Sequence, residues 1–127
     1  MDPPDDAIAI TEGIVWLENG VIFVQTNGVS GTRESAIESF GVLRDLLDGE
    51  LGLLLFDARK WPGGTVAAWT TGLGALKPHF TAVAMLIDPE NPPGPSPMFL
   101  DRLPIPFQVF TDEAESLAFL REFPPNE

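Results

Sequence analysis

The segment Leu51-Gly-Leu-Leu-Leu-Phe-Asp57, which leads into Ala58-Arg-Lys-Trp-Pro-Gly-Gly-Thr65, decides the fold of this chain. An apolar run of strand length that ends on an acidic residue and enters a Gly/Pro loop is typical of a buried parallel strand. A parallel strand delivers its following loop to one edge of an α/β sheet, where such folds usually place their function. We therefore expect residues 51–56 to lie inside a sheet that is covered on both faces.

The N-terminal half predicts a β-hairpin followed by an amphipathic helix. Two β-prone runs, residues 14–17 and 21–24, flank Asn19-Gly20, a dipeptide that tolerates the positive φ angles of a tight hairpin turn. Between residues 30 and 48 apolar side chains recur at helical spacing. The expected inward residues are Ile37, Phe40, Val42 or Leu43, and Leu47, with Ser30 or Thr32 as N-cap and Gly49 just beyond the end.

A second helix and a second buried strand follow the central segment. Thr65 is expected to cap the helix, and the apolar run 80–87 predicts the strand. The expected inward stripe of the helix consists of Val66, Trp69, Leu73 and Leu76.

The last part of the chain predicts a proline-rich loop over residues 88–97, with Ser96 and Pro97 starting a short helix over 98–102. Residues 105–110 are expected to form a strand near a sheet edge, because a proline lies within it. Thr111 is expected to cap a final helix. Its inward residues are Leu117, Phe119 and Leu120.

Alternating strands and helices at these spacings indicate an α/β fold with a mixed, mostly parallel sheet, right-handed crossovers and an antiparallel N-terminal hairpin. The 127 residues are enough for one domain. We expect a flexible tail at residues 1–6, a single domain over 7–123 and a second tail at 124–127.

The net charge of −12, from seven Lys and Arg against nineteen Asp and Glu, argues against nucleic acid and anionic membrane surfaces as partners. The first residues have no basic segment followed by an apolar one, as a secretory signal would. No apolar stretch approaches the roughly 20 residues that span a bilayer. The expected location is therefore the cytoplasm, without membrane insertion.

The layout resembles the STAS and SpoIIAA-like superfamily, which includes anti-sigma-factor antagonists and lipid-transfer-like domains, and is most similar to its uncharacterised bacterial branch. The resemblance covers residues 12–122. It is carried by Leu53-Leu-Leu-Phe-Asp-Ala-Arg59, by Thr81-Ala-Val-Ala-Met-Leu-Ile87 and by Pro106-Phe-Gln-Val-Phe-Thr-Asp-Glu-Ala-Glu-Ser-Leu-Ala-Phe-Leu120. It implies a SpoIIAA-like fold and a non-enzymatic regulatory or protein-interaction module.

Phosphorylatable members of that superfamily carry an Asp-Ser-Ser-Gly motif after the central strand, and this sequence departs from it. The corresponding segment is Trp61-Pro-Gly-Gly-Thr-Val66, in which only Thr65 offers a hydroxyl group. A phosphate would be stabilised at a helix start. A helix cap alone explains a threonine at this position, so a cap is the expected role of Thr65.

The loop after the central strand is the candidate interaction site, formed by Asp57, Arg59, Lys60, Trp61 and Thr65. It holds two of the seven cations beside an indole, and exposed Arg and Trp contribute strongly to protein interfaces. The alternative is that Arg59 pairs with Asp57 and that Trp61 packs on Pro62. Asp57 has no partner at a spacing that suggests catalysis, so a loop-capping carboxylate is expected.

A second candidate site is an apolar pocket for a small lipid-like molecule, and ordinary core packing is its alternative. The expected pocket residues are Trp69, Leu73, Met85, Met98 and Phe99.

The sequence offers little for metal or cofactor chemistry. It has no cysteine and the single histidine His79, and its glycines do not follow a nucleotide-binding spacing. No enzyme activity, metal or cofactor is therefore expected. The leading hypothesis is an interaction module that binds an unidentified protein or itself as a homodimer. The alternatives are an apolar-ligand carrier and, last, an enzyme that uses Asp57.

Overall fold

The computed structural model describes residues 2–76, 79–93 and 105–124. Its described elements form a six-stranded sheet, with strands in the order β1-β2-β3-β4-β5-β6, and three helices. The strands are β1 (Ile8–Ile10), β2 (Gly13–Glu18), β3 (Val21–Thr26), β4 (Gly52–Asp57), β5 (Phe80–Leu86) and β6 (Phe107–Phe110). The helices are α1 (Arg33–Leu47), α2 (Val66–Leu76) and α3 (Glu113–Leu120).

The sheet is mixed and mostly parallel, as predicted. β3 pairs with β4, β4 with β5 and β5 with β6 in parallel, whereas β1, β2 and β3 are antiparallel. The turn between β2 and β3 has Asn19 at φ 53° and Gly20 at φ 78°, the left-handed pair that a two-residue hairpin requires. β1 extends the hairpin by one short strand that the sequence pattern did not predict.

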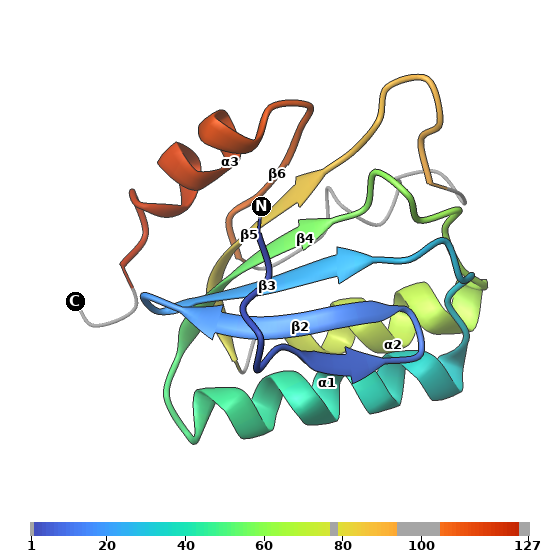
Figure 1. Cartoon of the computed structure of the whole chain (residues 1–127), viewed down its shortest axis with the longest axis horizontal. Helices are drawn as coiled ribbons and strands as arrows, with labels where there is room; N and C mark the ends of the chain where they lie inside the picture. The colour runs from blue at the N-terminus through green and yellow to red at the C-terminus, as the bar shows by residue number, and fades with distance from the viewer. Residues whose placement is uncertain (1, 77–78, 94–104, 125–127) are drawn as a thin grey trace.

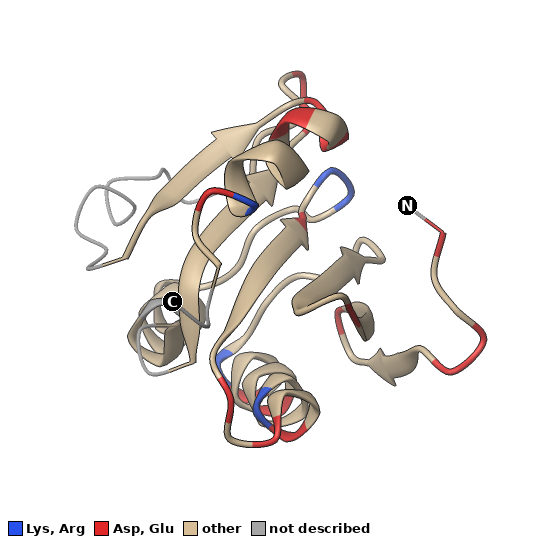
Figure 2. Cartoon of the chain, turned by 90° about the vertical axis from the view of Figure 1, so that its left-hand side faces the viewer, with Lys and Arg blue, Asp and Glu red and all other residues tan. Residues whose placement is uncertain are grey.

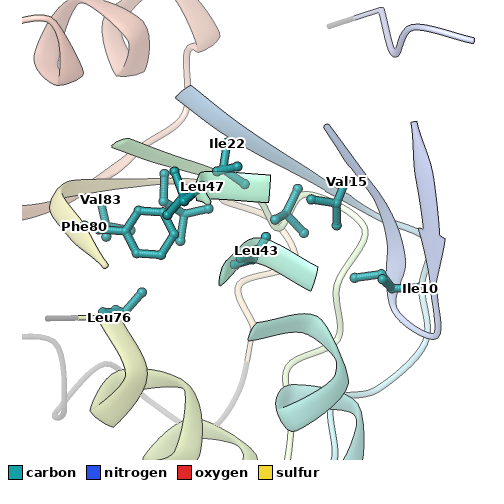
Figure 3. Packing of buried hydrophobic residues seen from close by; sticks show 10 residues of the cluster. Ile10, Val15, Ile22, Leu43, Leu47, Leu76, Phe80 and Val83 are labelled. Carbon is teal, nitrogen blue, oxygen red and sulfur yellow. The ribbon is translucent and has the colours of Figure 1, made fainter. Parts of the chain in front are cut away.

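Helices cover both faces of the sheet, α1 and α2 on one and α3 on the other (Figure 1). Successive residues of β4 alternate between these faces: Leu54 packs with residues of α1 and α2, whereas Leu53 and Leu55 pack with Leu120 of α3. The strand that begins at Gly52 is thus covered on both sides, as predicted, whereas Leu51 precedes it and is 46% exposed. Figure 3 shows the cluster under α1 and α2, where Leu43, Leu47 and Leu76 meet side chains of the sheet.

Three expectations about the helices are wrong. Ile37 and Val66 are 55% and 60% exposed, because the inward face of α1 is set by Ala36, Ser39 and Leu43 and that of α2 by Ala68, Trp69 and Leu76. The N-cap of α3 is Asp112 rather than Thr111, and the Asp112 carboxylate accepts a hydrogen bond from the Ala114 N–H at 3.1 Å. The short helix expected over residues 98–102 lies outside the described residues.

Two glycines allow α1 and α2 to approach each other, and they differ in the space around them. A Cβ on Gly72 would lie 3.4 Å from Phe40 Cε2, an ordinary contact, whereas a Cβ on Gly64 would lie 2.9 Å from the Gly31 carbonyl oxygen. We expect Gly72→Ala to raise the free energy of unfolding by about 0.5–1 kcal/mol, because alanine loses less backbone entropy in a helix. Urea denaturation checks this, with Gly64→Ala as the destabilised control; a destabilised Gly72→Ala variant would contradict it.

Candidate functional site

The loops at the carboxyl ends of the parallel strands β3, β4 and β5 meet the first turns of α1 and α2 at one edge of the sheet. Gly31, before α1, and Gly64, before α2, form an isolated parallel bridge. The Gly31 N–H donates to the Gly63 carbonyl oxygen at 2.9 Å, and the Thr65 N–H donates to the Gly31 carbonyl oxygen at 3.1 Å. The two helix starts are thereby tied together beside the loop that the sequence singled out.

Asp57 and Arg59 form a closed pair within this loop. The Arg59 side chain donates to Asp57 through Nε at 2.9 Å and Nη2 at 2.8 Å, and its backbone N–H donates at 3.1 Å. The Asp57 side chain is 6% exposed and that of Arg59 is 42% exposed. Hydrogen bonding to Asp57 raises the pKa of the Arg59 guanidinium above its ordinary value. Asp57 therefore caps this loop by accepting hydrogen bonds from Arg59.

Trp61 is buried rather than exposed, so the expectation that it presents an indole for partner docking is wrong. Its Nε1–H donates to Glu12 Oε1 at 2.9 Å. Its ring lies 5.2 Å from that of Phe56 and 5.3 Å from that of Trp69, measured between centroids. The preference of an indole for an apolar environment with one hydrogen-bond acceptor explains this position.

Sequence reasoning missed Glu12, because nothing local marks it. It lies in the turn between β1 and β2 and is 49 residues from Trp61. Gly31 provides the space for the pair, since a Cβ there would lie 2.8 Å from Glu12 Oε1 and 3.0 Å from the Trp61 ring. Only the folded arrangement of three loops brings these residues together.

Thr65 and Lys60 complete the expected interaction loop and are exposed. Thr65 Oγ1 accepts a hydrogen bond from the Ala68 N–H at 3.1 Å, so it caps α2 as predicted. Lys60 lines a surface groove together with Arg59 and Asn91. Figure 2 shows these two cations on one loop, whereas acidic residues spread over the N-terminal segment, α1 and the start of α3.

A cavity of about 110 Å³ lies between the sheet and helices α1 and α2. Trp69 and Met85 line it, as the apolar-pocket hypothesis expects; Met98, Phe99 and the side chain of Leu73 lie outside what the structure describes. Among the described residues that line it, all are apolar apart from Glu12 and Ser39. The lining residues are Glu12, Ala36, Ser39, Phe40, Leu54, Phe56, Trp61, Ala68, Trp69, Gly72, Leu76, Val83, Met85 and Phe107.

His79 stands at the junction between α2 and β5, where its carbonyl oxygen accepts from the Gly52 N–H at 3.0 Å. Within residues 2–76, 79–93 and 105–124, no three His, Asp or Glu side chains converge as a metal site would require. In the same residues, no helix combines the length and the apolar character needed to span a membrane.

The strand order, the hairpin at one end and the helices on both faces define a SpoIIAA-like α/β fold. A solved structure with that fold is similar to this chain: an uncharacterized protein from the DUF3478 family of Shewanella loihica PV-4. The TM-score is 0.56 at 20% sequence identity, covering 94% of this chain and 98% of that one. At this identity the similarity establishes the fold alone. No family model matches the chain, and a search of curated proteins finds no match.

Proposed function

We propose that this chain is a non-enzymatic binding module of SpoIIAA-like fold, and that it binds a small apolar molecule in the cavity between the sheet and helices α1 and α2. The observation that supports this is the cavity itself. It lies among the rings of Trp61, Trp69 and Phe40, where a well-packed core would leave little space. Ligand sites are typically concave and apolar, with few polar groups that fix orientation.

The size of the cavity limits the ligand. An engineered apolar cavity of about 150 Å³ binds benzene. A cavity of about 110 Å³ therefore suits a small ring or a short branched chain after slight adjustment of its walls. A complete two-chain lipid would need far more room. The ligand class is thus a small hydrophobic molecule, or one apolar group of a larger molecule.

This proposal predicts saturable binding of small aromatic hydrocarbons. Benzene, toluene and ethylbenzene are titrated into the protein, and binding is followed by calorimetry and by the fluorescence of Trp61 and Trp69, which line the cavity. Ala36, 7% exposed in the wall, provides the control. We expect Ala36→Leu to weaken binding by about tenfold or more, because its side chain occupies the ligand's place. Absence of binding to the unmodified protein would refute the proposal.

A second candidate function is the protein-interaction module that the resemblance implies, and the groove at Arg59 and Lys60 favours it. Lys60 lies beside the half-exposed Arg59, which is paired with Asp57. On a chain with a net charge of −12, the Lys60 ammonium group is complementary to an acidic partner or to the acidic surface of a second copy. Trp61 does not contribute, since it is buried. Lys60→Glu should abolish capture of such a partner, or dimer formation in sedimentation. A monomer that captures no partner would contradict this candidate.

A further inference from the structure

Glu12 is a buried acidic residue in a cavity whose described lining is mostly apolar. The residue is 7% exposed, and Oε1 accepts the indole hydrogen bond from Trp61. Among the residues that the structure describes, no second donor reaches this carboxylate. A buried carboxylate with one hydrogen bond has spare acceptor capacity, because two oxygens can accept about four. A ligand in the cavity can supply the missing donor.

The other polar residue of the wall is already engaged. The Ser39 hydroxyl donates to the Ser35 carbonyl oxygen at 2.8 Å, one turn earlier in α1. Glu12 is therefore the only charged group in the described lining of the cavity. A polar group on a bound ligand would therefore have to be compatible with the Glu12 carboxylate.

The rings beside Glu12 favour the same kind of ligand. Phe56 and Trp61 meet edge to face, and Trp61 and Trp69 are tilted at 53°. The faces of aromatic rings carry negative electrostatic potential and attract ammonium groups, with tryptophan the strongest. A carboxylate next to indoles is thus a suitable environment for an organic cation. A carboxylate or phosphate ligand would instead be repelled by Glu12 at short range.

We propose that the cavity selects a small apolar amine in its ammonium form, with the apolar body among the rings and an N–H⁺ donating to Glu12. This inference rests on the proposed function, since it names the chemical class of the ligand in the same cavity. The surplus of carboxylates over the whole chain adds to it by raising the local concentration of cations near the surface.

Benzylamine tests the inference against ethylbenzene, which has the same shape without the charge, and against benzoate, which has the opposite charge. Each is titrated into the unmodified protein and into Glu12→Gln, with calorimetry as the readout. Glutamine keeps the size of the side chain and an oxygen that can accept from Trp61 Nε1. We expect Glu12→Gln to weaken benzylamine binding by about tenfold or more and to change ethylbenzene binding much less, because ethylbenzene has no group that pairs with the carboxylate. Benzoate should not bind the unmodified protein, because the Glu12 carboxylate repels it.

The outcomes separate this inference from the proposed function. Two results would overturn the ammonium preference and leave the apolar site intact. In the first, benzylamine binds no more tightly than ethylbenzene. In the second, Glu12→Gln does not weaken the binding of benzylamine. Failure of both ethylbenzene and benzylamine to bind overturns the site itself. If Glu12→Gln does not fold, the inference is tested on the unmodified protein by the NMR chemical shift of the Trp61 indole N–H. Benzylamine should shift it more than ethylbenzene does, and equal shifts would refute the inference.

Discussion

Replacing Trp61 with phenylalanine is expected to lower the free energy of unfolding by about 3 kcal/mol. Phenylalanine retains most of the apolar contact with Phe56 and Trp69 but cannot donate to Glu12 Oε1. Glu12, which is 7% exposed in the unmodified protein, then lacks the one side-chain hydrogen bond that the described residues give it. A buried charged group that loses its partner costs more than the hydrogen bond contributed, and the smaller ring adds a packing loss. Urea denaturation at neutral pH measures the effect.

Trp16 provides a matched control on the opposite face of the sheet. It is 5% exposed and stacks on Phe23 at 5.2 Å, and no hydrogen bond from another described residue involves its side chain. Trp16→Phe therefore loses packing alone and should cost about 1 kcal/mol. If Trp61→Phe is no more destabilising than Trp16→Phe, the indole hydrogen bond does not stabilise Glu12. Equal effects would also remove the support for a fixed carboxylate in the cavity wall.

The fold could be predicted from the sequence because its main signals are local. Asn19-Gly20 specifies the hairpin turn through its backbone angles, and Thr32 and Thr65 cap α1 and α2 through contacts within four residues. The run that forms β4 is apolar at consecutive positions because both faces are covered. β1 gave no such signal, since a three-residue strand is too short for a recognisable alternation.

The site was predicted only in part, because its key contacts join distant segments. Asp57 and Arg59 are two residues apart, and this short spacing already indicates that they can pair. The Glu12 and Trp61 pair depends on the turn before β2 reaching the loop after β4, with Gly31 leaving space between them. Exposure of Ile37 has the same origin: helical spacing alone cannot tell which of several neighbouring faces the rest of the fold will cover.

The contact between Glu12 and Trp61 also separates the two candidate sites in physical terms. Trp61 lines both the cavity and the groove that holds Arg59 and Lys60. Its indole forms a wall between an apolar space and a polar surface, held from the side of the cavity by Glu12. Variants at Ala36 alter the cavity alone, and variants at Lys60 alter the groove alone. The two functions can therefore be tested independently.

Arg59→Ala is expected to lower the free energy of unfolding by about 2 kcal/mol, although the guanidinium is 42% exposed. The substitution removes two of the three hydrogen bonds that Asp57 accepts from residue 59. The Asp57 side chain, which is 6% exposed in the unmodified protein, keeps only the hydrogen bond from the backbone N–H of residue 59. Removing one partner of a buried pair is destabilising mainly because the remaining charge is uncompensated. Partial exposure of the arginine lets water compensate some of this, which keeps the value below that of a fully buried pair.

Lys60→Ala is the control, because it changes the net charge by the same amount at the neighbouring, exposed position. It should change the free energy of unfolding by less than about 0.5 kcal/mol.

The raised pKa of Arg59 also sets the sign of the pH dependence. The contribution of Arg59 to stability is complete below the pKa of arginine in the unfolded chain, and it is lost only as pH rises through the higher pKa in the folded protein. The difference between Arg59→Ala and the unmodified protein should therefore stay constant from about pH 7 to about pH 9. Two results would contradict this prediction: an Arg59→Ala variant about as stable as the unmodified protein, or a loss of stability that disappears between these pH values. Either would show that Arg59 does not hold Asp57 in place, and Asp57 would again be a candidate reactive carboxylate.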